Sequence, residues 1–224
     1  MRLTGLVCIA LAVQLSGGPP AVLPEAAVVQ LAASLKHSQS HTNHIWRDTV
    51  PLNADGTINA YVEISRGDRR KWEYDMRRNE RAIDRVVPPD VGGYPVNYGF
   101  VPQTISYDGD PFDVLVLGPP IPGGSRVRGV IVGVMHMEDE KGLDSKVVIS
   151  RVGPDGQAVE LLTSADERRI GDYFRRYKRH EPGKFSKVEG WGTTAQGLAF
   201  VEMTHAFFRE CRNVRRAACR SIVR

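Results

Sequence analysis

The chain has 224 residues, of which 42% are hydrophobic and 25% are charged. Such a chain forms one large globular domain, or one ordinary domain with appendages. Its formal net charge of +4 is compatible with nucleic acid, but equally with a small polyanionic substrate. The three cysteines (Cys8, Cys211 and Cys219) exclude a metal-spaced pattern and a disulfide framework. Cys211 and Cys219 can pair only if the chain turns back, because one continuous helix would separate them by about 12 Å.

The first residues have the features of a signal peptide. Arg2 precedes an apolar run from Leu3 to Leu15, and glycines and prolines at positions 17–20 end it. We therefore predict that the protein is exported to the periplasm or to the extracellular space, with residues 1–20 as the signal peptide. The alternative is a disordered extension on a cytoplasmic protein. The run is shorter than the roughly 20 apolar residues of a membrane-spanning helix, so we expect no stable membrane span.

Residues 21–55 carry few charges and show little periodicity, and we interpret them as a solvated polar linker or extension. His37, His41 and His44 would share one face if this segment were helical. No carboxylate or cysteine completes a metal site with them, so the linker interpretation is preferred.

Short candidate strands begin at residue 56. They cover Ile58–Ile64, Lys71–Tyr74 and Ala82–Val87, with glycine- or proline-rich turns between them. Alternation along the second strand places Lys71 and Glu73 on one face. Strands of this length and spacing predict a barrel or a sandwich.

Two acidic turns each lead into an apolar strand. Asp108, Asp110 and Asp113 lie within six positions, directly before the run Val114–Leu117. Pro111 cannot donate to a sheet ladder, which places these aspartates in a turn. The second turn contains Asp139 and Asp144. It follows a valine-rich strand over residues 125–137 and precedes another strand over 147–149.

Carboxylates this close together repel one another unless a positive charge lies between them. Without Cys or His ligands nearby, they suit a hard, oxygen-binding cation, with Mg²⁺ preferred over Zn²⁺. Paired Mg²⁺ ions about 3.5–4 Å apart are a standard device of phosphoryl chemistry, and Lys or Arg neutralises the phosphate oxygens. The residues alone therefore predict metal-assisted phosphate chemistry, without naming the substrate.

Two helices are expected near the C-terminus. Ser164–Glu167 is a capping-box sequence, and an apolar stripe follows it at Ile170, Tyr173, Phe174 and Tyr177. Thr193–Gln196 offers a second capping box, and the helix that it opens contains Leu198, Val201, Phe207 and Phe208. The arginine-rich residues 210–224 are interpreted as a basic tail.

The heptapeptide Asp108-Gly109-Asp110-Pro111-Phe112-Asp113-Val114 resembles the signature of soluble family I inorganic pyrophosphatases. Further blocks resemble the family in its order: Glu63, Lys71-Trp72-Glu73, Asp84-Arg85, Tyr94–Gly99, Met137–Glu140 with Asp144 and Lys146, Tyr177-Lys178, and Lys187–Trp191. The resemblance covers roughly residues 58–208.

This resemblance implies an α+β fold, with a five-stranded OB-like β-barrel flanked by two C-terminal helices, after an N-terminal extension. The pyrophosphatase domain would span residues 56–209 and hydrolyse diphosphate to two phosphates with Mg²⁺. The resemblance assigns metal binding to Asp108, Asp110, Asp113, Asp139 and Asp144, and makes Asp110 also the general base. The implied phosphate-binding residues are Lys71, Arg85, Tyr98, Lys146, Tyr177 and Lys178. Glu63 and Glu73 would be site-lining acids, and the protein would form a homo-oligomer.

Three other interpretations differ from this one in function. A barrel with a basic surplus can bind single-stranded nucleic acid, but aspartates at the strand ends would repel a phosphate backbone unless metal is bound. We therefore expect no nucleic-acid partner. The carboxylates alone also allow a phosphatase that acts on nucleotides or phosphomonoesters. A purely structural acidic turn predicts that neutralising Asp110 costs no activity.

Overall fold

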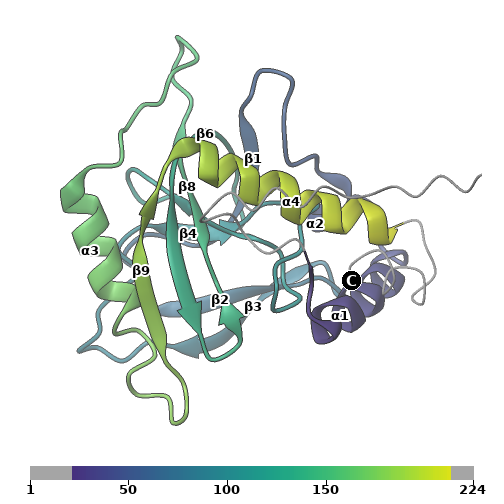
Figure 1. Ribbon diagram of the computed structural model, residues 1–224, viewed down its shortest axis with the longest axis horizontal. Coiled ribbons are helices and arrows are strands. Elements are labelled where there is room, and N and C mark those ends of the chain that lie inside the picture. The colour runs from purple at the N-terminus through teal and green to yellow at the C-terminus, as the bar shows by residue number, and fades with distance from the viewer. Residues whose placement is uncertain (1–21, 213–224) are drawn as a thin grey trace, which may run out of the picture.

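The computed structural model describes residues 22–212, and five of its strands close into a barrel. These strands are β1 (Ile58–Ile64), β4 (Asn97–Phe100), β5 (Asp113–Val116), β6 (Arg126–Asp139) and β8 (Lys146–Arg151). They pair in the order β1–β4–β5–β8–β6, and β6 returns to β1 (Figure 1). The β5–β8 pair is parallel, whereas its neighbours around the ring are antiparallel. This arrangement confirms the predicted five-stranded OB-like barrel.

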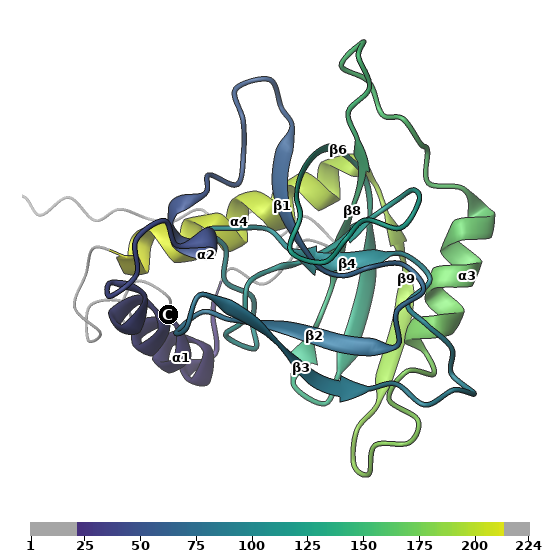
Figure 2. The same cartoon turned by 180° about the vertical axis from the view of Figure 1, so that it is seen from behind.

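Four further strands lie outside the ring of five. β7 (Gly142–Leu143) and β9 (Ser186–Gly192) pair with β6, and β2 (Arg70–Asp75) and β3 (Glu80–Val86) form a separate hairpin alongside (Figure 2). The hairpin confirms two of the predicted strands. The sequence did not predict β4 or β9 as strands, because turn-forming and aromatic residues surround β4 and two glycines interrupt β9.

The two predicted C-terminal helices flank the barrel as α3 (Ser164–Phe174) and α4 (Thr194–Arg212) (Figure 1). The capping box of α3 joins Thr163 and Asp166, one residue earlier than predicted. The box of α4 is as predicted, because Thr193 and Gln196 hydrogen-bond reciprocally. The helix continues to Arg212, so the predicted basic tail starts within it. Cys211 is buried and disulfide-bonded.

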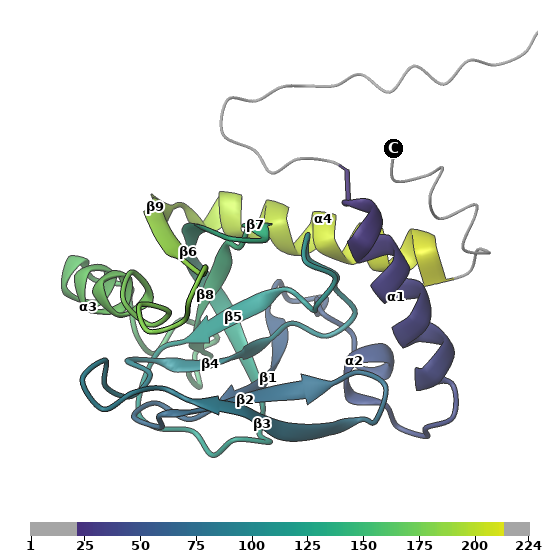
Figure 3. The ribbon, with the colours of Figure 1, turned by 90° about the horizontal axis from the view of Figure 1, so that it is seen from below.

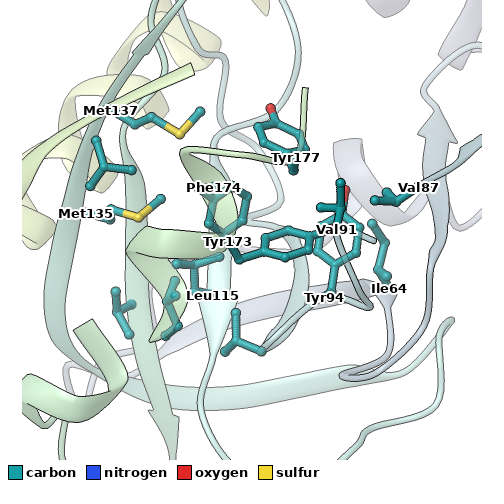
Figure 4. Packing of buried hydrophobic residues seen from close by; sticks show 14 of the residues in the cluster. Ile64, Val87, Val91, Tyr94, Leu115, Met135, Met137, Tyr173, Phe174 and Tyr177 are labelled. Atoms are coloured by element: carbon teal, nitrogen blue, oxygen red, sulfur yellow. The ribbon is translucent and has the colours of Figure 1, made fainter. Parts of the chain in front are cut away.

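A hydrophobic cluster joins the barrel to α3. Leu115, Met135 and Met137 project from the barrel strands toward Phe174 and the aromatic ring of Tyr177 (Figure 4). Because α3 ends at Phe174, Tyr177 lies in the turn beyond the helix rather than on its predicted apolar stripe. The cluster therefore fixes the turn that carries two of the predicted site residues, Tyr177 and Lys178.

The linker interpretation of residues 21–55 is wrong over two helices, α1 (Glu25–Ser38) and α2 (Ile45–Asp48). Ala27, Val28 and Leu31 on α1 pack into a hydrophobic cluster with residues of α2 and α4. Figure 3 shows α1 crossing beside the C-terminal part of α4. The apolar stripe of α1 is short and is interrupted by serine and alanine, so its periodicity is weak. The docking surface that stabilises it is supplied by distant parts of the chain.

The histidines of this segment do not form a metal site. His44 is buried and caps α2 by accepting a hydrogen bond from the Arg47 N–H. Burial lowers the pKa of His44, which favours its neutral form. Within residues 22–212, no group of three or more His, Cys, Asp or Glu side chains is arranged to hold a metal ion.

The predicted signal peptide, the rest of the basic tail and Cys219 lie outside the described residues. Among the helices within the described range, none is long and apolar enough to cross a membrane.

If α1 is part of the folded body, its buried leucine must contribute to stability. We predict that Leu31→Ala lowers the free energy of unfolding by about 2–5 kcal/mol, because the Leu31 side chain is fully buried. Leu161→Ala is the matched control, since Leu161 is 74% exposed, and it should change stability by less than about 0.5 kcal/mol. Urea denaturation of both variants measures this difference. Equal effects would mean that α1 does not dock.

Candidate active site

The parallel pairing of β5 and β8 brings the two acidic turns to one end of the barrel. Val114 pairs with Val147, so both strands begin at the same edge. β6 runs antiparallel to β8 and therefore ends at that edge, with Asp139 as its last residue. Lys146, the first residue of β8, donates hydrogen bonds to Asp113 at 2.7 Å and to Asp144 at 2.8 Å. The two acidic turns thus meet at one end of the barrel.

Backbone hydrogen bonds shape the first acidic turn. The Ser106 N–H donates to the Asp110 carbonyl at 2.7 Å, and the Gly109 N–H donates to the Ser106 carbonyl at 3.1 Å. Gly109 has a φ of +90°, a conformation that favours glycine. The Asp110 N–H donates to Asp108 Oδ1 at 3.1 Å, and the buried ring of Phe112 anchors the end of the turn. The aspartates are therefore held on a defined backbone.

A cavity of about 320 Å³ lies at this end of the barrel. Twelve of the thirteen predicted site residues line it: Glu63, Lys71, Glu73, Arg85, Tyr98, Asp108, Asp110, Asp113, Asp139, Asp144, Tyr177 and Lys178. Lys146 is the exception, because it is 1% exposed and lies behind the wall, between Asp113 and Asp144. The structure thus gathers the predicted residues, which come from all five barrel strands, the β2–β3 hairpin and the turns between strands and after α3.

The cations around the cavity are paired with acids. Lys71 on β2 contacts Asp84 at 3.2 Å and also bonds to Glu73. Arg85 on β3 contacts Glu181 at 2.8 Å. Lys178 joins Asp139 at 2.6 Å and Glu140 at 2.9 Å, with its side chain 8% exposed. These ion pairs hold positive groups of the hairpin and of the turn after α3 in the lining of the same cavity as the aspartates.

Burial and mutual repulsion favour the protonated forms of several acids. Burial raises the pKa of Asp110 to about 7, and the Asp108 carboxylate adds to the effect. The Asp110 side chain is still 49% exposed in the recessed cavity, and repulsion by the neighbouring acids contributes to the raised pKa alongside burial. Burial likewise raises the pKa of Asp144 to about 7, against the charge of Lys146. Burial raises the pKa of Glu63 well above its ordinary value, and its carboxyl accepts the Tyr74 N–H at 2.6 Å.

The two tyrosines are suited to donate hydrogen bonds. Burial raises the pKa of both Tyr98 and Tyr177, and nearby aspartates raise it further. Their hydroxyl groups therefore stay protonated at neutral pH and can donate to an anion.

The donor set of the cavity fits a hard divalent cation. Among the described residues that line it, nine are acidic and five are basic, so carboxyl groups outnumber cationic groups. The available donors are carboxylate oxygens, the ligands that Mg²⁺ prefers. As the side chains lie, lysines separate these carboxylates, and no three of the described acids are grouped tightly enough to hold an ion. The aspartates that could bind cations are those of the two turns: Asp108, Asp110, Asp113, Asp139 and Asp144.

Several cavity residues were not among the predicted set. Asp84 and Glu140 are adjacent in sequence to predicted residues, so the neighbouring motifs could have revealed them. Lys141 lies within the second acidic turn and contacts Asp108 at 3.5 Å. Gln30 of α1 does not line this cavity, but it donates a hydrogen bond to Asp110 at 2.5 Å across 80 positions of sequence, and no local sequence pattern predicts this contact.

Known proteins of similar sequence and structure belong to one family. Residues 60–209 match the family model described as inorganic pyrophosphatase. An inorganic pyrophosphatase of Sulfolobus acidocaldarius is 36% identical over 158 residues, which cover 67% of this chain and 91% of that protein. The inorganic pyrophosphatase structure from Thermus thermophilus has a TM-score of 0.67 at 33% identity and covers 74% of this chain and 99% of that one. The corresponding structure from Coxiella burnetii has a TM-score of 0.65 at 36% identity, with 71% and 99% covered.

Lys146 should be essential to the folded state, because it compensates two carboxylates while almost fully buried. We predict that Lys146→Met destabilises the protein by about 3–5 kcal/mol at a pH of about 8 in metal-free buffer. The charge of Lys146 lowers the pKa of Asp144, so removing it raises that pKa further. When the pKa of an acid is higher in the folded than in the unfolded state, the folded protein loses stability as the pH rises above the unfolded pKa. The deficit should therefore shrink as the pH falls toward about 5.

The matched control is Lys187→Met, since the Lys187 side chain is 66% exposed on β9 and pairs with Glu189. It should change stability by less than about 1 kcal/mol at either pH. Chemical denaturation across the pH range measures both variants. A Lys146→Met protein with the stability and pH dependence of the control would contradict the pairing.

Proposed function

Because the chain belongs to the inorganic pyrophosphatase family, we propose that it hydrolyses inorganic diphosphate to two phosphates with the help of Mg²⁺. The observation that carries this proposal is the convergence of two acidic turns and several cations around one cavity. A small polyanion needs positive groups to bind it, and the surplus acids need a divalent cation to balance them. One cavity that holds both kinds of group suits a substrate bound together with metal.

The aspartates of the two turns would hold Mg²⁺, which when bound supplies charge to phosphate oxygens and acidity to water. Lys146 keeps Asp113 and Asp144 at fixed positions through its two hydrogen bonds. Lys178 does the same for Asp139. The lysines thus keep the acidic side chains in place in a site where repulsion would otherwise drive them apart.

Asp110 is the general base in this proposal. Without bound metal, burial and the neighbouring Asp108 carboxylate raise its pKa above the ordinary value, which favours acceptance of a proton near neutral pH. Its side chain is 49% exposed, more than that of the other four aspartates of the two turns, so a water molecule can reach it. Asp110 would remove the proton from the water that attacks phosphorus.

The positive and hydroxyl groups would bind the two phosphates. Arg85 can present a planar fork to two oxygens, whereas Lys71 and Lys178 act as point charges. Tyr98 and Tyr177 would donate hydroxyl hydrogen bonds. Glu63 and Glu73 line the site, and Glu63 fixes the end of β2, next to the hairpin turn, by accepting a hydrogen bond from the Tyr74 backbone N–H. Export and homo-oligomeric assembly stay predictions from the sequence and from the family resemblance.

The role of Asp110 is tested by removing its charge alone. We predict that Asp110→Asn lowers kcat for phosphate release from diphosphate by about 10²–10⁴-fold, because the base is lost. The thermal midpoint should stay the same or rise, since repulsion with Asp108 is relieved. The measurement is steady-state phosphate release with Mg²⁺ present, with ATP as a parallel substrate.

Asp172→Asn is the matched control. Asp172 is 66% exposed on α3, where it pairs with Arg175, so this variant should keep wild-type turnover. Full turnover by Asp110→Asn would refute the assigned base. Release from ATP at the rate seen with diphosphate would instead favour a broader phosphatase.

A further inference from the structure

The helix α1 precedes the region that matches the family, yet it reaches the active site. The family match begins at residue 60, whereas α1 ends at Ser38. Gln30, in the middle of α1, donates its side-chain N–H to Asp110 Oδ1 at 2.5 Å. The contact joins an element outside the family core to the proposed general base.

Gln30 is placed by a packed helix rather than by a loop. Its neighbours Ala27 and Leu31 are fully buried against α2 and α4. In the acidic turn, Gly109 allows α1 to approach closely, because a Cβ at position 109 would lie only 2.9 Å from the Cβ of Gln30. The turn and the helix are therefore complementary at this point.

Asp110 lies where its orientation would otherwise be weakly determined. It lines the active-site cavity of about 320 Å³ and also a second cavity of about 360 Å³, which is lined in part by Gln30 and Ser34 of α1. The acids Asp108, Glu73 and Asp113 surround it, and the Nζ of Lys141 is 4.0 Å from its Oδ2. A carboxylate between two cavities, among like charges, can rotate unless a donor holds it.

We propose that Gln30 is a positioning residue for Asp110, so that α1 completes the active site. The amide is neutral, so it orients the carboxylate without cancelling the charge needed to bind a cation or accept a proton. It engages Oδ1, whereas Oδ2 lies 4.0 Å from the Nζ of Lys141. Partners of this kind, which orient a functional carboxylate from outside, typically contribute about 10–100-fold to activity or metal affinity.

The inference rests on the proposed function, and Gln30→Met tests it. Methionine keeps the length and the helix propensity of glutamine but removes the donor. We expect kcat for diphosphate to fall about tenfold, with KM changed less than about twofold. Mg²⁺ binding, measured by titration calorimetry without substrate, should weaken in the same variant, while the thermal midpoint stays within a few degrees.

Gln39→Met is the matched control at the exposed end of the same helix, and it should behave as the wild type in all three measurements. Gln30→Ala is a second variant without the donor and should reproduce the losses if Gln30→Met folds poorly. Wild-type kcat and Mg²⁺ affinity in both Gln30 variants would overturn the proposal. A rise in kcat would also overturn it, because Gln30 would then restrain Asp110.

Parallel assays of the wild type and Asp110→Asn distinguish a failure of the proposed function from a failure of the positioning role of Gln30. If the wild type releases no phosphate from diphosphate, the proposed function fails. If the wild type is active but Asp110→Asn keeps full turnover, the base assignment fails, and the role proposed for Gln30 fails with it. If those two proteins behave as expected but the Gln30 variants match the wild type, the positioning role alone fails.

Discussion

A buried lysine between two acidic turns is the interaction on which the site depends. Lys146 lies at the start of β8 with 1% of its side chain exposed, and it bridges Asp113 and Asp144. Without a cation between them, two carboxylates in a recessed site repel each other strongly, because the local dielectric constant is low. The lysine is in the right place because β5 and β8 are parallel neighbours in the ring. The strand pairing of the barrel therefore also determines where the charges of the site lie.

The rest of the site extends this charge balance outward. The β2–β3 hairpin contributes Lys71 and Arg85, and the turn after α3 contributes Lys178. Each is already paired with an acid, so each is held in position before any ligand arrives. The helix α3 fixes its turn through the hydrophobic cluster around Phe174, while α1 docks on α4 and reaches Asp110. Hydrophobic packing outside the cavity thus helps to determine where the polar and charged side chains of the site lie.

Much of this was predictable from the sequence, and the failures have physical causes. The strand that follows Asp113 and the capping box at Thr193 depend on local residue patterns, and both were found. The strand β4 was missed because pairing on both sides overrides its turn-rich composition. The helix α1 was missed because its apolar stripe is weak and its docking surface comes from residues far along the chain. The Gln30 contact has no local signal, so only the tertiary structure reveals it.

We expect the surplus carboxylates of the two turns to bind divalent cations that offset their repulsion. The most direct test is the thermal midpoint of the substrate-free protein during a Mg²⁺ titration, compared with NaCl at equal ionic strength. A ligand that binds the folded state adds about 2.7 kcal/mol at a hundred times its Kd. The account predicts a midpoint that rises steadily with Mg²⁺ and rises much less in an Asp139→Asn variant. A midpoint that responds to Mg²⁺ only as it responds to NaCl would contradict it.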